Sequence, residues 1–371
     1  MEVAINLILN LLLLVLGFVF LVKGADIFVD GSSSIAKILK IPAVIVGVTV
    51  VSMGTSLPEL AVSTTAAMRG ANEIALSNVV GSNTFNFMVV LGMTAVLAKT
   101  AVPVKKSLLK VEFPLGLVMV AVLGLMSCDL LFKGGIFSEG NIFSNANAHV
   151  ATGSLGRTDG IILLIVFVLY MAYTVKAALS ARRDAKELEN EGREYDEIEE
   201  EIKEEDEKEL KAISKKLDQL GKAHPVILAL VYIVLGVVLI KFGGDFVVRS
   251  ATFIASTCGM SQTLIGLTIV ALGTSLPELV TSVVAARKDE CDLAVGNVVG
   301  SNLFNILLIL GVSSTIHPIM IFSASVVDII VLFFTSLIGT LFCLGKRSVN
   351  RLEGFSMVAI YVVYLIYIII R

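Results

Sequence analysis

Long apolar segments, separated by short polar breaks, fill most of the chain. A helix of about 20 mainly apolar residues spans the hydrocarbon layer of a bilayer, which is about 30 Å thick. The segments long enough to do so cover residues 4–30, 41–68, 73–98, 107–131 and 158–181, and then 225–251, 260–286, 292–315, 321–344 and 352–370. This pattern predicts an all-α integral membrane protein with ten transmembrane helices.

The second five segments repeat the first five. Residues 54–60 read Gly-Thr-Ser-Leu-Pro-Glu-Leu and recur as residues 273–279. The motif Gly-Ser-Asn-x-Phe-Asn occurs at residues 81–86 and again at 300–305, with the same offset of 219 residues. A unit with an odd number of spans leaves its copy inverted in the membrane, as in many secondary transporters. We therefore predict two inverted five-helix repeats.

Charged residues gather between the repeats. They make up 16% of the 371 residues, against about 25% in a typical soluble protein, and 56% of the residues are hydrophobic. Residues 197–207 are mostly acidic but lack the ligand spacing of an EF-hand. We predict a first repeat over residues 1–181, a solvated cytoplasmic linker over 182–224 and a second repeat over 225–371. A cation sensor is the alternative function for the linker.

Basic residues in the breaks predict which side of the membrane each break faces. One side would hold Lys37, Lys40, Lys99, Lys105, Lys106, Lys110, Arg287, Lys288, Lys346, Arg347 and Arg351, and the other Arg69, Lys133, Arg157, Arg249 and Arg371. The richer side is cytoplasmic by the positive-inside rule. We predict a multi-pass protein of the plasma (inner) membrane, with both termini outside and linker 182–224 inside. Residues 132–157 would then form an irregular external loop.

Glu59 and its repeat equivalent Glu278 are the candidate functional residues, because each stands in the middle of an apolar span. A charge at the bilayer centre costs roughly 2.5–3.5 kcal/mol on insertion scales, and such residues usually serve a function. Pro58 donates no backbone hydrogen bond and crowds the carbonyl of Gly54. Backbone oxygens are therefore expected to be free beside the carboxylate.

Small polar residues accompany both glutamates. On a continuous helix, Ser52, Thr55 and Ser56 share one face with Glu59. The second copy presents Ala271, Thr274 and Ser275 beside Glu278, and the next span of each repeat adds Ser82 and Asn86, or Ser301 and Asn305. Such residues often serve only to pack membrane helices. Their recurrence beside both glutamates favours a binding site.

Carboxylates, hydroxyls and carbonyls are hard oxygen ligands, which suit Na⁺ and Ca²⁺; Mg²⁺ fits less well because it resists dehydration. Two carboxylates that face each other in a low dielectric repel strongly. One divalent cation cancels both charges, and so do two monovalent cations or two protons. This equivalence allows different cations to compete for one site, which is the basis of antiport.

Other classes of function lack support in the sequence. No nucleophile–base pair or metal-binding histidine motif indicates an enzyme. The cysteines Cys128, Cys258, Cys291 and Cys343 are scattered, which is typical of apolar core residues. We expect the lipid bilayer as surroundings, Na⁺ and Ca²⁺ as transported ions, no organic cofactor, no nucleic acid and no obligate protein partner.

The paired motifs resemble those of the sodium/calcium exchanger family within the cation/calcium antiporter superfamily. The resemblance implies that Glu59 and Glu278 hold Ca²⁺ centrally, with carbonyls near Thr55 and Thr274. It also implies two Na⁺ sites that share these glutamates, one with Thr274, Ser275, Ser82 and the Ala271 carbonyl, the other with Thr55, Ser56, Ser301 and the Ser52 carbonyl. Asn86 and Asn305 would occupy a middle position. About three Na⁺ would be exchanged for each Ca²⁺, which makes the exchange electrogenic.

Two alternatives remain beside Na⁺/Ca²⁺ exchange. A proton-coupled antiporter for Ca²⁺ or another divalent cation is the nearer one, although such relatives typically read Gly-Asn-Ala-x-Glu at the first motif. A cation channel is less favoured, because one chain holds both copies of the site whereas channels usually form a ring of subunits. Some potassium-dependent relatives carry Asp at the position of Asn305, so the amide argues against K⁺ co-transport.

Overall fold

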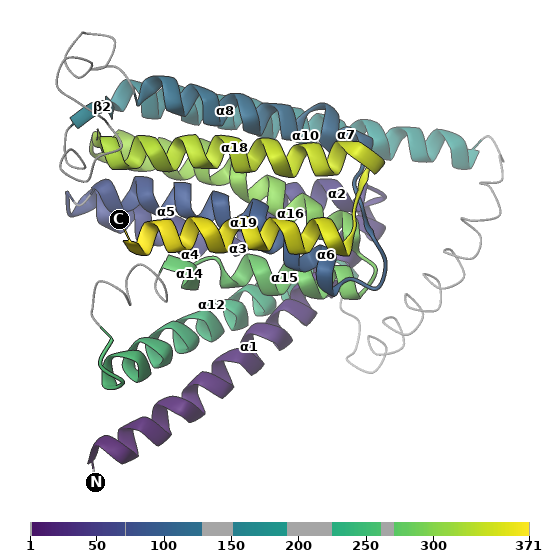
Figure 1. The fold of residues 1–371 in the computed structure, drawn as a ribbon. Helices are drawn as coiled ribbons and strands as arrows, with labels where there is room; N and C mark the ends of the chain where they lie inside the picture. The colour runs from purple at the N-terminus through teal and green to yellow at the C-terminus, as the bar shows by residue number, and fades with distance from the viewer. Residues whose placement is uncertain (1, 71, 128–150, 191–224, 261–270, 371) are drawn as a thin grey trace.

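The structure is a computed structural model that describes residues 2–70, 72–127, 151–190, 225–260 and 271–370. Long helices run side by side across the molecule, and one pair, α1 (Glu2–Leu39) and α12 (Pro225–Thr257), extends away from the rest (Figure 1). The other longer helices are α4 (Leu57–Met68), α5 (Asn72–Phe85), α8 (Glu112–Met126), α10 (Arg157–Asn190), α15 (Leu276–Arg287), α16 (Cys291–Phe304), α18 (Ser323–Lys346) and α19 (Arg351–Ile370).

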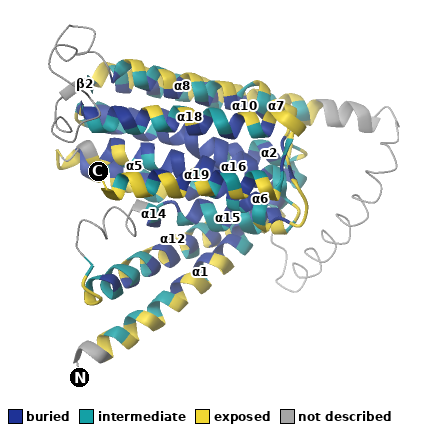
Figure 2. Cartoon of the chain, in the orientation of Figure 1, coloured by how far each residue is buried: buried dark blue, intermediate teal, exposed yellow. Residues whose placement is uncertain are grey.

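Shorter segments extend or precede these helices. They are α2 (Ala43–Val46), α3 (Ser52–Thr55), α6 (Leu91–Leu97), α7 (Lys106–Lys110), α14 (Ala271–Gly273) and α17 (Gly311–Ile316), with π-helical turns η1 (Gly47–Val51), η2 (Asn86–Val90) and η5 (Asn305–Leu310). Buried residues concentrate on α5 and α16 in the middle of the bundle, whereas α1 and α12 are exposed along one side (Figure 2). The α5 and α16 helices therefore form the centre of the fold.

The described residues contain eight helices long and apolar enough to cross a membrane, or nine if the bent pair 43–55 and 57–68 counts as one span. The protein is thus a helical membrane protein, as the apolar pattern predicts. The predicted span 260–286 falls partly on residues 261–270, which lie outside the described residues, as does most of the linker 182–224. The first predicted span, 4–30, is too short, because α1 continues through Asp30 to Leu39.

The described residues also contain short strands, which the all-α prediction did not include. Strand β1 (Val102–Pro103) pairs antiparallel with β4 (Ser348–Val349), and β2 (Ala151–Leu155) pairs with β3 (Ile319–Phe322). The predicted irregular loop 132–157 therefore ends in a strand at residues 151–155. Each of these pairs joins segments from both halves of the chain, so the two halves pack as one body.

Glycines allow α1 and α12 to approach closely. A Cβ atom on Gly236 of α12 would lie 2.7 Å from the Cα of Phe28, and a Cβ on Gly24 of α1 would lie 2.8 Å from the backbone nitrogen of Ile240. Only glycine fits at such contacts, which are common between membrane helices. The two helices form a tight pair, and α1 also contacts α15 in the main bundle.

An ion cluster fixes the later half of α1 to the turn after α15. The Lys288 amine lies 2.6 Å from an Asp30 carboxylate oxygen and 3.1 Å from one of Asp26. Burial lowers the pKa of Lys288, but hydrogen bonding and charge from Asp30, and then from Asp26, outweigh it and raise the pKa above its ordinary value. The amine therefore stays charged at neutral pH. At the equivalent of Asp30, the second repeat carries Arg249, so this cluster has no full copy in the other repeat.

We expect Lys288→Met to loosen α1 from the bundle. A partly exposed ion pair contributes up to about 1 kcal/mol, so amide hydrogen exchange over residues 26–39 should speed up by at most about fivefold. Lys23→Met is the matched control, because the Lys23 side chain is 70% exposed and lies 3.8 Å from Asp26. Exchange that is equally fast in both variants, or unchanged in Lys288→Met, would contradict this role of the cluster.

Candidate cation site

In both copies of the glutamate motif, the helix is interrupted at the serine that lies two residues before the proline. Ser56 separates α3 from α4 with φ −85° and ψ 7°, and Ser275 separates α14 from α15 with φ −94° and ψ 5°. The two helices on either side of Ser56 are bent by 49°. A proline in the first turn of a helix is well tolerated because its missing N–H is not needed there. The helix predicted as continuous over residues 52–59 is therefore bent at Ser56, although Ser56 N still donates to the Ser52 carbonyl at 3.0 Å.

The two glutamates are held by serines of the opposite repeat. Ser56 donates a hydrogen bond of 2.9 Å to Glu278 Oε1, and Ser275 donates one of 3.2 Å to Glu59 Oε1. All four side chains are completely buried. The bend at each serine points its hydroxyl across to the other repeat, so the structure brings the two motifs together at one place.

The hydroxyls of the next spans join the same cluster. The hydroxyl oxygens of Ser275 and Ser82 lie 3.0 Å apart, while Ser301 lies 3.5 Å from the Asn297 Oδ1 atom. The Thr55 hydroxyl oxygen lies 3.0 Å from Asn297 Oδ1 and 3.3 Å from the Ser52 carbonyl oxygen. Ser82 and Ser301 are thus both beside the glutamate motifs, but they take different partners.

The remaining predicted residues lie at the edge of this cluster. Thr274 is half-buried and donates to Asn78 Oδ1 at 3.4 Å. Ala271 begins α14, directly after residues 261–270, which the structure does not describe. The structure therefore brings Thr274 next to the site and places the Ala271 backbone at the start of the segment that leads into it.

Four buried oxygen atoms of the site accept no hydrogen bond from the described residues. They are Glu59 Oε2, Glu278 Oε2, Asn86 Oδ1 and Asn305 Oδ1. A buried acceptor without a partner costs roughly 1–3 kcal/mol, and more when it is charged. All four atoms are hard ligands, two from each repeat, and a cation is a partner that such oxygens accept. The described part of the chain contains no group of three or more His, Cys, Asp and Glu side chains arranged to hold a metal ion.

Asn297 and Asn78 lie one helical turn before Ser301 and Ser82, and their hydrogen bonds hold the residues around the site in place. The sequence analysis did not assign them this role. Asn297 donates to Ser282 at 3.0 Å and lies 3.5 Å from the Glu278 carbonyl. Asn78, its repeat equivalent, donates to Ser63 at 2.9 Å and lies 3.4 Å from the Glu59 carbonyl. Their recurrence at the offset of 219 residues was the available signal.

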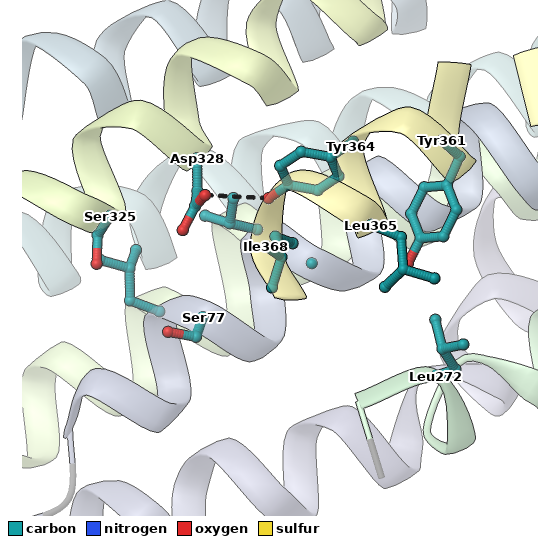
Figure 3. A pocket seen from close by; sticks show the side chains of 11 residues that line it. Ser77, Leu272, Ser325, Asp328, Tyr361, Tyr364, Leu365 and Ile368 are labelled. Carbon is teal, nitrogen blue, oxygen red and sulfur yellow. Dashed lines mark hydrogen bonds between the residues drawn. The ribbon is translucent and has the colours of Figure 1, made fainter. Parts of the chain in front are cut away.

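A cavity of about 160 Å³ lies next to the site, between α5, α14, α18 and α19 (Figure 3). Gly81, which precedes Ser82, lines it together with Asp328. The Tyr364 hydroxyl lies 3.2 Å from an Asp328 oxygen, and both groups face this space (Figure 3). Asp328 interrupts the apolar span 321–344, which is a signal that the sequence analysis passed over. It adds a carboxylate to this cavity, separate from the paired glutamates.

The fold is that of a helical membrane protein, and its candidate site buries two carboxylates, one from each repeat, as expected of a cation transporter. The family profile described as "Sodium/calcium exchanger protein" matches residues 9–176 and 228–370. The chain belongs to the sodium/calcium exchanger family and is a cation/calcium antiporter, not an enzyme. The resemblance inferred from the paired motifs is thereby confirmed.

Relatives of full length support this assignment. The chain is 36% identical to the putative antiporter CaxA of Alkalimonas amylolytica over 352 residues, which covers 94% of this chain and 95% of CaxA. It is 31% identical to the sodium/calcium exchanger MaX1 of Methanosarcina acetivorans, with 96% and 97% covered. The exchanger NCX_Mj, in crystals soaked with zero Na⁺ and Ca²⁺, has a TM-score of 0.73 and 27% identity over 98% of this chain and 99% of NCX_Mj. Other NCX_Mj crystals were soaked with Na⁺ together with Ca²⁺ or Sr²⁺.

Proposed function

We propose that this antiporter exchanges Na⁺ for Ca²⁺ by alternating access, with about three Na⁺ for each Ca²⁺. The observation that carries the proposal is the set of four unpaired buried oxygens, two carboxylate and two amide, contributed equally by both repeats. Their formal charge of −2 matches one Ca²⁺. The surrounding serine and threonine hydroxyls add neutral ligands, so the site has oxygens for further Na⁺ without further negative charge.

Each predicted ligand keeps a role in this proposal. Glu59 and Glu278 hold Ca²⁺. One Na⁺ site uses Ser82, Thr274, Ser275 and the Ala271 carbonyl, the other uses Thr55, Ser56, Ser301 and the Ser52 carbonyl, and Asn86 and Asn305 serve the middle position. The short distances from the Ser275 hydroxyl to Glu59 Oε1 and to the Ser82 hydroxyl support the first grouping, because they bring ligands of the two repeats within reach of one ion.

The proposal includes ten transmembrane helices as two inverted repeats, residues 1–181 and 225–371. Two glycine contacts, one on Gly92 and one on its repeat equivalent Gly311, support it. A Cβ on Gly354 of α19 would lie 2.5 Å from the Gly92 carbonyl, and a Cβ on Gly160 of α10 would lie 2.7 Å from the carbonyl of Gly311. Gly311 is the repeat equivalent of Gly92, so the last helix of each half packs on the same element of the other half.

The proposed orientation places both termini outside a plasma (inner) membrane and linker 182–224 in the cytoplasm. Ion pairs join basic residues assigned to the cytoplasmic side with the turn after α15 and with the first turn of α16. Lys99 lies 2.5 Å from Asp289, and Lys105 lies 3.4 Å from Asp292. The two chain ends lie at the opposite end of the bundle from this turn (Figure 1). Both observations fit a protein whose two termini share one side.

Voltage dependence tests the coupling. Each cycle should move one net positive charge with the sodium, and one charge crossing 100 mV is worth about 2.3 kcal/mol. We expect an inside-positive potential, set with valinomycin and external K⁺, to speed Ca²⁺ uptake into vesicles that contain the purified protein and internal Na⁺.

Controls separate the alternatives in the same vesicles. Uptake that requires internal Na⁺ but ignores the potential would mean electroneutral exchange and would overturn the proposed stoichiometry. Uptake that follows a pH gradient without Na⁺ would establish proton coupling instead. Ca²⁺ flux without any counter-ion would indicate a channel.

A further inference from the structure

Two asparagines of the second motif form a reciprocal pair between the central helices. Asn83 at the end of α5 donates through Nδ2 to the backbone carbonyl of Asn302, at 3.1 Å. Asn302 on α16 donates through Nδ2 to the backbone carbonyl of Asn83, at 3.4 Å. The two residues are repeat equivalents, and their exposed fractions are 1% and 4%. The pair therefore links the repeats in the buried centre of the bundle.

The backbone carbonyls fix the orientation of both amides. A carbonyl only accepts hydrogen bonds, so the NH₂ group of each side chain must face it and the Oδ1 atom must face the other way. Asn83 Oδ1 accepts from Asn305 Nδ2 at 2.9 Å, and Asn302 Oδ1 accepts from Asn86 Nδ2 at 3.1 Å. Each member of the pair thus requires a donor from a predicted site asparagine.

This requirement decides which atom of the site asparagine remains available. Once Nδ2 of Asn86 and of Asn305 is used by the pair, Oδ1 is the other end of each amide. These Oδ1 atoms are the two amide oxygens that are buried without a partner among the described residues. A half-turn of either amide would instead present an NH₂ group, which repels a cation, and would set oxygen against oxygen at the pair.

We propose that Asn83 and Asn302 are positioning residues that act across the repeats: Asn83 holds the carbonyl oxygen of Asn305, and Asn302 that of Asn86, in the orientation that binds the cation. This inference rests on the proposed function only in taking the buried oxygens as cation ligands. Partners that orient metal ligands typically change metal affinity by about 10- to 100-fold when removed. The pair also requires a hydrogen-bond donor at position 305, because an ionised carboxylate there would face Asn83 Oδ1.

A double-mutant cycle on the purified full-length protein tests the cross-repeat action, with equilibrium Ca²⁺ binding as the readout. Asn83→Leu keeps the side-chain size, and it leaves the backbone carbonyl that Asn302 needs. We expect it to weaken Ca²⁺ binding about 10-fold. In an Asn305→Ala background it should weaken binding no further. In an Asn86→Ala background it should weaken binding by the same 10-fold as in the wild type.

The reciprocal arm uses Asn302→Leu, which should lose its effect with Asn86→Ala and keep it with Asn305→Ala. A merely structural role would lower the melting temperature of the cation-free protein but would not distinguish Asn86 from Asn305. Asn83→Ser and Asn302→Ser replace any leucine variant that fails to fold, since they also remove the amide.

Equal losses in both backgrounds, or unchanged Ca²⁺ binding in the single variants, would overturn the positioning role. A wild type that binds Ca²⁺ and follows the expected cycle, but does not exchange it for Na⁺, would refute the proposed exchange and leave the positioning role supported. A wild type that binds no Ca²⁺ or Sr²⁺ would refute both.

Discussion

Replacing Glu59 or Glu278 with Gln should abolish Ca²⁺ transport. Each variant halves the formal charge of a fully buried site and removes an unpaired carboxylate oxygen. Breaking a buried charge pair costs about 3–5 kcal/mol, which corresponds to a loss of Ca²⁺ affinity of at least about 100-fold. Ca²⁺ uptake into Na⁺-loaded vesicles and equilibrium Ca²⁺ binding are the measurements, each normalised to the amount of folded protein.

Glu112→Gln is the matched control for these variants. Glu112 in α8 is also a buried carboxylate with an oxygen that lacks a partner among the described residues, but it lies outside the paired glutamate motifs. We expect this variant to retain Ca²⁺ transport. Transport within tenfold of the wild type in Glu59→Gln or Glu278→Gln would rule out the central role of the two glutamates.

Replacing Gly300 with Ala should destabilise the protein and weaken cation binding together. A Cβ at Gly300 of α16 would lie 2.6 Å from the Cα of Val48 and 2.7 Å from Ser52 Oγ, closer than side chains pack. The new methyl group must push η1 and α3 away from α16. Overpacking of this kind costs about 1–3 kcal/mol, and the displaced segment carries Ser52 and Thr55 of the site. We expect a lower melting temperature and weaker stabilisation by added Ca²⁺.

The close contact of Gly300 with η1 and α3, and not the loss of glycine itself, is the reason that this substitution should destabilise the protein. In a helix interior, alanine is otherwise more favourable than glycine by about 1 kcal/mol. Gly116 of α8 serves as the control, because it is buried and a Cβ there would meet no described atom within 4 Å. Gly116→Ala should leave the melting temperature unchanged or raise it. An equal decrease in both variants would show that the close approach of α16 and η1 is not the cause.

The sequence predicted the helical membrane class and the family because both depend on features that neighbouring residues carry. Apolar runs must match the bilayer thickness, so their length is visible directly. The recurrence of Glu59 as Glu278 and of Asn86 as Asn305 is equally local, since a duplicated motif keeps its spacing. Strands β1 and β4 were missed because they hold two residues each, too few for a periodic pattern.

The partners across the repeats were decided only by the tertiary structure. An offset of 219 residues shows that Ser56 and Ser275 are equivalent, but not that each one reaches the glutamate of the other repeat. The same holds for Asn83, whose amide oxygen accepts a hydrogen bond from Asn305 and not from Asn86, which is nearer in the sequence. Which residues are equivalent in the two repeats can be read from the sequence alone. Contact depends on how α5 and α16 cross and on the bends before Pro58 and Pro277, which only packing of the whole bundle fixes.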